Sequence, residues 1–243
     1  NVSIVSDVEV HFKGSTVLDN GLKVAAVIEL EAERTNSSTA RNADQQYVEL
    51  SGGWGAVSIG ERLNAATRVH TSAPGAGAGF SDIAAMNSQG GGANLSTAAA
   101  VTSMSNYYTT VDGIANAGRN STAIDYVSPM FGPFAFGVTY TPAVGSRGLA
   151  VEGFSIKDLL GGALVYADKW GPVSVNADVA YARAEHESTI QSGMLHGVPV
   201  GVKFGYAGFE LGGSYFRIMD NVRNYSSDGS TTATSFDGYA WDA

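Results

Sequence analysis

Four histidines are the side chains of this sequence best suited to bind a metal or to move a proton: His11, His70, His186 and His196. Their positions along the chain do not match the short ligand spacings of zinc sites. The chain also has no cysteine, which excludes cysteine–zinc sites and a disulfide framework. The histidine and cysteine content therefore predicts no metal site.

Other motifs of enzyme chemistry are incomplete. The segment PGAGAGF, from Pro74 to Phe80, imitates a glycine-rich phosphate loop, but that motif needs a buried strand and a βαβ unit, which the sequence does not predict. No Gly-x-Ser-x-Gly motif occurs, and no Ser/His/Asp set shares a strand face, so we expect no enzyme. Carboxylates near Asp220 and Asp228 could hold calcium in a loop, although ordinary solvated carboxylates explain them more simply. No other cofactor is expected.

Charges at every second position are a stronger signal. In LKVAAVIELEAER, residues 22–34, apolar side chains such as Ile28 and Leu30 alternate with charged ones. Period two is typical of a strand, whereas a helix would scatter the charges around its axis. The run is longer than the average strand of about 5–6 residues. Its acids share one face: Glu29, Glu31 and Glu33.

The lengths of the connections between such strands follow a rule. About eleven strands are predicted, and the links after odd strands are short: DNG, GGW, PMFGP, WGP and AG. The links after even strands are long, at roughly 35–44, 63–121, 143–157, 187–195 and 220–235. This alternation is typical of an up-and-down antiparallel barrel with two different rims, whereas a Greek-key sandwich mixes its connection lengths.

Composition favours a barrel in a membrane. Only 15% of the 243 residues are charged, whereas about 25% is usual in soluble domains. A membrane strand needs about 9–11 residues, and all its backbone groups must pair, so the sheet must close. Ile28 and Leu30 would then face lipid, and Val27 and the glutamates would face water. The net charge of −9 argues against nucleic acid as a partner.

At this point the sequence resembles the general bacterial porins of Gram-negative outer membranes. DVEVHFKGSTVLDNGLKVAAVIELEAE looks like their second and third strands, YVELSGGWGAVSIGE is similar to their next hairpin, and RNSTAIDYVSPMFGPFAFGVTYTP to the hairpin after the constriction loop. The resemblance implies an outer-membrane channel for small hydrophilic solutes and ions, usually a homotrimer among membrane lipid and lipopolysaccharide. It also implies a barrel of about 16 strands, with the third external loop folded into the pore. The alternative is a non-transporting surface β-protein, such as an adhesin or a soluble β-sandwich.

The sequence departs from this pattern in two ways. It begins inside the pattern and ends at GYAWDA, so we expect it to be part of a longer chain, lacking about one strand in front and four behind. The Pro-Glu-Phe motif of many constriction loops is also absent. Residues 1–243 are accordingly read as one barrel domain, incomplete, with a long inward-folded third loop.

The charges of the inner face are the candidate functional residues. They would keep a water-filled lumen wet, and they would also set its selectivity. Acids outnumber bases, which predicts weak cation selectivity. Counting by alternation, the inward acids are Asp7, Glu9, Glu29, Glu31, Glu33, Glu49, Asp125, Asp178 and Glu210, and the inward bases are Lys13, Lys23, Arg62 and Lys203.

The connection at about 63–121 is the predicted constriction. At roughly sixty residues it is far longer than ordinary loops. It carries FSDIAAM, whose Ser81 could cap a short helix, and the pair Tyr107 and Tyr108, which a solvated loop would not need. We expect this loop to fold into the barrel with Asp82 and Asp112 as its acids. By resemblance to the family, the facing bases would be Lys13, Lys23, Arg62 and Arg119.

Overall fold

The structure is a computed structural model that describes residues 8–31, 43–62, 64–69, 71, 121–143, 156–187, 191–225 and 231–242. The predictions for Asp7, Glu33, Ser81, Asp82, Tyr107, Tyr108, Asp112, Arg119 and Asp228 lie outside these residues. The elements are β1 (Glu9–Val17), β2 (Lys23–Glu31), β3 (Ala43–Gly52), β4 (Gly55–Glu61), α1 (Ala65–Val69), β5 (Thr122–Val127), β6 (Phe134–Ala143), β7 (Ile156–Trp170), β8 (Val173–Glu187), β9 (Gln191–Tyr206), β10 (Phe209–Tyr225) and β11 (Thr231–Asp242).

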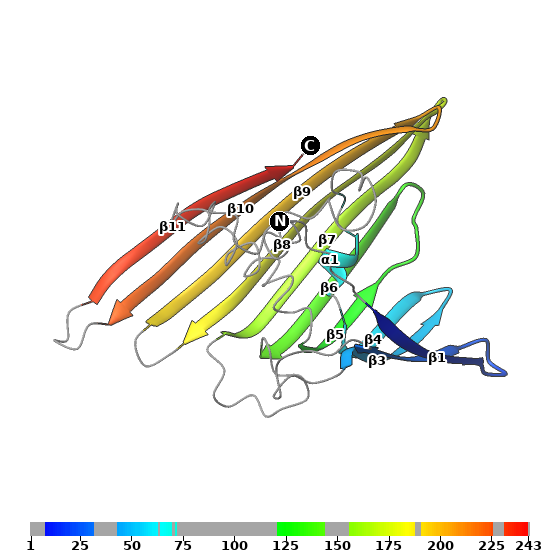
Figure 1. The fold of residues 1–243 in the computed structure, drawn as a ribbon, viewed down its shortest axis with the longest axis horizontal. Coiled ribbons are helices and arrows are strands. Elements are labelled where there is room, and N and C mark those ends of the chain that lie inside the picture. The colour runs from blue at the N-terminus through cyan, green and yellow to red at the C-terminus, as the bar shows by residue number, and fades with distance from the viewer. Residues whose placement is uncertain are drawn as a thin grey trace, which may run out of the picture.

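All eleven strands belong to one antiparallel sheet in which each strand pairs with the next along the chain (Figure 1). The predicted strand number and the up-and-down order are therefore confirmed. The sheet is open in the described part of the chain, where β1 and β11 form its two edges. None of the described helices is long and apolar enough to cross a membrane.

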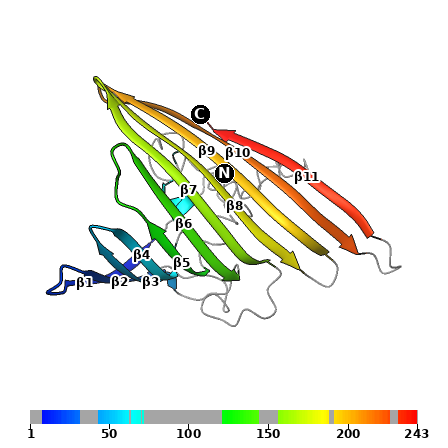
Figure 2. The ribbon, with the colours of Figure 1, turned by 180° about the vertical axis from the view of Figure 1, so that it is seen from behind.

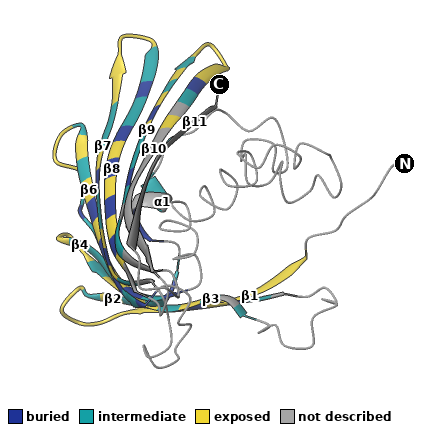
Figure 3. Ribbon diagram, turned by 90° about the vertical axis from the view of Figure 1, so that its left-hand side faces the viewer, coloured by how far each residue is buried: buried dark blue, intermediate teal, exposed yellow. Residues whose placement is uncertain are grey.

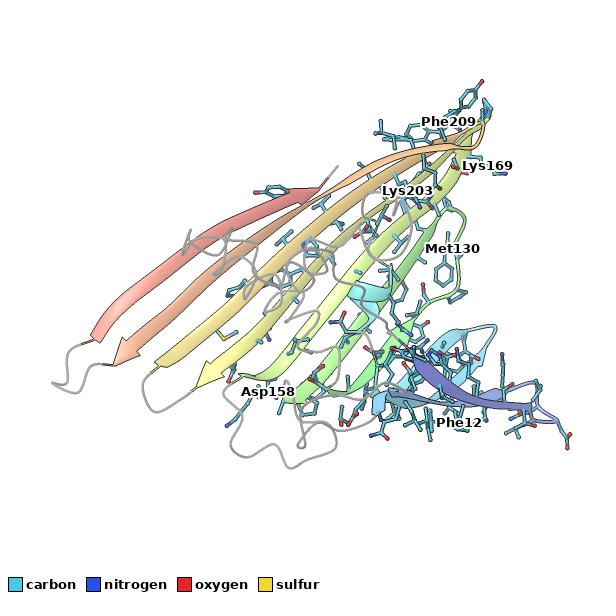
Figure 4. The ribbon with its side chains drawn as sticks, in the orientation of Figure 1. Phe12, Met130, Asp158, Lys169, Lys203 and Phe209 are labelled. Carbon is cyan, nitrogen blue, oxygen red and sulfur yellow. The ribbon has the colours of Figure 1, made fainter. Side chains whose placement is uncertain are left out.

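The short connections meet at one end of the sheet. Tyr206 and Phe209 close a two-residue hairpin at Ala207 and Gly208, whose φ angles are 50° and 86°. Positive φ at both central residues is the condition for a turn that matches the twist of a hairpin, and glycine adopts it without strain. Phe209 and Lys169 mark this short-turn rim in Figure 4, whereas Asp158, near the start of β7, lies toward the opposite rim.

The prediction for the long connections was right for three of five. Residues 32–42, 62–121 and 144–155 separate strands as expected. The predicted links 187–195 and 220–235 are shorter, because β8 continues to Glu187, β9 begins at Gln191 and β10 continues to Tyr225. These strand ends are mostly polar, so they lack the regular apolar alternation by which the sequence identifies a strand.

The exposed face of the sheet is apolar and the covered face is largely polar, which is the reverse of a soluble protein. Along β6, the aromatic residues Phe134 and Phe136 and the neighbouring Val138 are exposed, whereas Gly137 and Thr139 are buried. The same alternation of exposed and buried residues follows other strands around the curve of the sheet (Figure 3). The convex face, seen from behind in Figure 2, therefore carries the large apolar side chains.

An apolar outer face of this kind requires an apolar environment. A soluble β-sandwich would cover it with a second sheet, but all the described strands belong to a single sheet. Ile28 is 44% exposed and Val27 on the other face is 9% exposed, as the barrel reading predicts. Hydrocarbon meets such a face in outer-membrane barrels, where apolar residues point outward and polar ones inward.

Aromatic side chains border this apolar band on both sides. At the short-turn rim, Trp170 donates a hydrogen bond of 2.7 Å to the hydroxyl of Tyr166. Farther along the strands, Tyr140 bonds to Asp158 and Tyr181 to His196, each at 2.6 Å. Tyr140 and Tyr181 form a second aromatic row. They lie six residues after the first residue of β6 and eight after the first residue of β8, which is about 20–26 Å along the strand from the short-turn rim. That separation suits the two interfaces of an outer membrane, since the apolar band of such barrels is about 25 Å tall.

Candidate functional site

The concave face of the sheet forms a polar wall. Many of the residues on it are small or polar, and several polar ones are buried. Buried polar groups are costly unless they are hydrogen-bonded, so their partners show what covers the wall. The buried polar residues on the described strands are Glu29 on β2, Ser58 and Glu61 on β4, Asp125 on β5, Thr139 and Thr141 on β6, and Asp178 on β8.

The first turn of α1 is anchored to this wall. The backbone amide of Ala65 donates to the hydroxyl of Thr139 at 2.8 Å and to Oδ1 of Asp125 at 3.3 Å. The Thr139 hydroxyl in turn donates to the same Asp125 oxygen at 2.5 Å. A free amide at a helix start needs an acceptor, and two neighbouring strands supply it here. The chain that leaves β4 therefore enters the concave side of the sheet, where Figure 3 shows α1.

A second anchor follows α1. The backbone amide of Thr71 donates to Oδ1 of Asp178 on β8 at 2.5 Å. Between the two anchors, Val69 packs against the buried pair Ala163 and Ala180 on β7 and β8. The described residues at the start of this connection thus run along the wall from β5 toward β8.

Small residues make room for this segment. A Cβ atom on Gly137 would lie 2.8 Å from Cβ of Ala65, and one on Gly201 would lie 1.8 Å from the carbonyl oxygen of Thr71. Real Cβ atoms do not approach so closely, so larger residues at either position would displace the segment. Glycine and alanine on the inner face are therefore a condition for the chain to lie against the wall.

A group of charges stands beside the first anchor. Arg62 forms an ion pair with Glu49 on β3, and its guanidinium lies 4.1 Å from the ring centre of Tyr47. Arg68 on α1 faces the same group, and burial lowers its pKa, with the charge of Arg62 adding to the effect. An arginine nevertheless stays protonated at neutral pH. Two guanidinium groups and the carboxylates of Glu49 and Asp125 thus lie together where the connection leaves β4.

A second group lies on β1 and β2. Nε2 of His11 is 2.6 Å from Oε2 of Glu9, and Nδ1 of the same ring is 3.4 Å from Oε1 of Glu29. Gln45 on β3 donates to the other Glu29 oxygen at 2.6 Å. The ligand atoms of Glu9, His11 and Glu29 all lie within 4.8 Å of one another, a spacing suited to a metal ion. The spacing of the histidines in the sequence gave no sign of this group, because only strand pairing brings Glu29 to His11.

The predicted bases are spread over the wall. Lys23 belongs to the last pair before a short turn, opposite Val17, and Lys13 lies higher on β1, opposite Val27. Arg62 follows β4 at its other end, beside the start of the long connection. Lys203 lies 3.6 Å from Glu210 near the short-turn rim. The side chain of Glu31 lies outside what the structure describes, as do Glu33, Asp82, Asp112 and Arg119.

Some residues of the wall were not singled out by the sequence. Tyr47 supports Arg62, Thr139 links Asp125 to α1, and Arg68 adds a second guanidinium to that group. Period two places Tyr47 and Thr139 on the inner face, so their location was predictable. Their partners were not, since those contacts depend on how the long connection packs.

Comparison with known proteins agrees with this architecture. A family model described as Gram-negative porin matches residues 1–243. No curated protein matches. Among solved structures, the chain is similar to an anion-selective porin from Comamonas acidovorans, with 18% identity, a TM-score of 0.42, and coverage of 98% of this chain and 74% of that one.

Two further solved structures are of the same kind. A porin refined at 1.8 Å shows 13% identity and a TM-score of 0.39 over 96% of this chain and 75% of its own. A mutant porin of Rhodopseudomonas blastica shows 11% identity and a TM-score of 0.40 over 96% of this chain and 90% of its own. The match of the family model extends over the whole sequence, and the chain therefore belongs to the Gram-negative porin family, whose members are channels of the bacterial outer membrane.

Proposed function

We propose that this chain forms a weakly cation-selective diffusion channel for small hydrophilic solutes and ions, narrowed by the connection at 63–121. The observation that carries the proposal is the double anchor of that connection on the concave wall, through Ala65 and Thr71. A wide barrel leaves an aqueous space inside, so a loop that enters it reduces the cross-section open to solutes. Opposed charges across a narrow neck favour ions and polar solutes over apolar ones.

The charges of the wall support a modest preference for cations. Among the predicted inward residues whose side chains the structure describes, six are acids and four are bases, and the whole chain has a net charge of −9. The bases beside the first anchor offset part of this excess of negative charge. The predicted inward acids with described side chains are Glu9, Glu29, Glu49, Asp125, Asp178 and Glu210, and the predicted inward bases are Lys13, Lys23, Arg62 and Lys203.

Reversal potentials in a planar bilayer test the selectivity. In a gradient of potassium chloride at low salt, the full-length protein should pass potassium more readily than chloride. The preference should fade as salt rises, because the Debye length falls from about 10 Å at 0.1 M to about 3 Å at 1 M. One similar solved structure is named an anion-selective porin, and an anion preference at low salt here would contradict the proposal.

Deletion of Gly75 to Gly92 tests the constriction separately. The deletion should raise both the single-channel conductance and the size limit for solutes, while a heat-modifiable gel shift shows that the barrel still folds. An unchanged conductance in the folded variant would place the loop outside the pore. The anchors at Ala65 and Thr71 precede the deleted part, so they stay in the variant.

We also infer a homotrimer surrounded by membrane lipid and lipopolysaccharide. The apolar convex face suits lipid, and charged residues such as Arg183 and Glu185 are exposed beyond the second aromatic row, at the level of headgroups. Analytical ultracentrifugation in a density-matched detergent measures the oligomer directly, and a monomeric mass would contradict the trimer.

A further inference from the structure

The group of Glu9, His11 and Glu29 has the composition of a metal site. Glu9 and His11 alternate on one face of β1, and strand pairing sets His11 directly opposite Glu29 on β2. Both ring nitrogens of His11 are directed at carboxylate oxygens, at 2.6 Å and 3.4 Å. The three side chains therefore converge from two strands of the barrel wall, which is a rigid support for ligands.

The distances are close to those around a bound ion. Zinc binds imidazole nitrogen and carboxylate oxygen at about 2.0–2.2 Å, so two ligand atoms of one tetrahedral ion are about 3.4 Å apart. The ligand atoms of the three residues lie within 4.8 Å of one another. Because the two carboxylates face different nitrogens of the ring, the His11 ring and one carboxylate must turn to surround one ion. The side chains of Glu9 and His11 are 30% and 34% exposed, which leaves the group open to ions from the water.

The neighbouring residues hold one ligand in place. Glu29 is 8% exposed, and Gln45 donates a hydrogen bond of 2.6 Å to its Oε2, which leaves Oε1 on the side of His11. Partners of this kind orient a metal-binding carboxylate. Three protein ligands with one open side leave a coordination position for water. The combination of imidazole with carboxylates favours zinc, copper or nickel over magnesium and calcium, which prefer oxygen ligands alone.

We propose that Glu9, His11 and Glu29 bind a divalent transition-metal ion, such as Zn²⁺, on the inner wall of the barrel. The binding itself does not depend on the selectivity of the channel. If the chain conducts as proposed above, the bound ion also adds positive charge to the wall at β1 and β2, and it lowers the preference for cations.

Isothermal titration of the full-length protein in detergent with zinc chloride tests the binding. The wild-type protein should bind zinc, and His11→Ala and Glu29→Gln should each weaken the binding at least about tenfold, since each removes a ligand. Gln45→Ala, which removes only the orienting partner, should weaken the binding less than either ligand variant does. His196→Ala is the matched control, because His196 pairs with Tyr181 outside this group, and it should bind zinc like the wild type.

Two outcomes would overturn the proposal: a wild-type protein that binds no zinc, and zinc binding that survives both His11→Ala and Glu29→Gln. A second measurement needs no variant. Electron paramagnetic resonance of the wild-type protein with one equivalent of Cu²⁺ should show hyperfine coupling to a single imidazole nitrogen, and a spectrum without nitrogen coupling would also overturn it. Reversal potentials with and without zinc then report on the channel alone, so a failure of the proposed selectivity leaves the result on binding intact.

Discussion

The backbone amide of Thr71 donates a hydrogen bond of 2.5 Å to Oδ1 of Asp178, a residue 107 positions away in the sequence. The contact joins the segment after α1 to the inner face of β8. A hydrogen bond to a charged acceptor contributes more than one between neutral groups, about 1.5–3 kcal/mol. The geometry at Asp178 therefore influences where the long connection lies inside the barrel.

Replacement of Asp178 should release this anchor. Asp178→Ala removes the acceptor and the charge, whereas Asp178→Asn keeps an oxygen acceptor and removes only the charge. We expect the alanine variant to be cleaved faster in the 63–121 connection during limited proteolysis, by up to about tenfold if about 1.4 kcal/mol of local stability is lost. The asparagine variant should stay near the wild type. Cleavage of the alanine variant at the wild-type rate would show that Asp178 does not hold the connection.

A methyl group at Gly201 should displace the same segment. In Gly201→Ala the new Cβ would lie 1.8 Å from the carbonyl oxygen of Thr71, so the backbone of the segment must move. We expect a stability loss of about 1–3 kcal/mol in urea unfolding and a changed single-channel conductance. Gly161→Ala is the control on the same wall, where the nearest atoms lie at 3.9 Å. Identical conductance for both variants would contradict the placement of Thr71.

Lysine substitutions at two adjacent positions on β2 should differ in their cost to stability. Ile28→Lys puts an ammonium group on the lipid face and should cost about 2–4 kcal/mol if the position lies near the middle of the membrane. Val27→Lys points to the lumen, where Glu29 and Glu49 lie on the same face, and it should cost little. Folding into lipid vesicles, followed by urea titration, measures both. A similar penalty at the two positions would be incompatible with the barrel orientation.

Arg62 and Glu49 should have opposite effects on selectivity. Arg62→Met removes the charged guanidinium that lies over Tyr47 and keeps an unbranched side chain of similar length, so the cation preference should increase. Glu49→Gln should decrease it, and the double variant should return toward the wild type. The side chains are 18% and 23% exposed, and we expect a coupling free energy of about 1 kcal/mol in a double-mutant cycle of unfolding. A coupling free energy of zero in the unfolding cycle would argue against the pair.

The sequence by itself determined the strands and their two faces. In a membrane barrel each residue of a strand meets either lipid or the lumen, so the apolar and polar positions alternate along the chain itself. Val27 and Ile28 could be assigned to opposite faces for this reason, and the turn at Ala207 and Gly208 could be located from its length and composition. The ends of β8 to β10 were underestimated because mostly polar segments carry no such pattern.

The tertiary structure alone decided which residues of the inner face meet. His11 and Glu29 become neighbours through the register of β1 and β2, and the sequence spacing of the histidines gave no sign of that group. The contacts of Ala65 and Thr71 with the wall depend on the path of the connection after β4, which no periodic pattern encodes. Alternation specifies the face on which a side chain lies, because it is a local property of the strand. The partners across that face follow only from strand pairing and loop packing between distant parts of the chain.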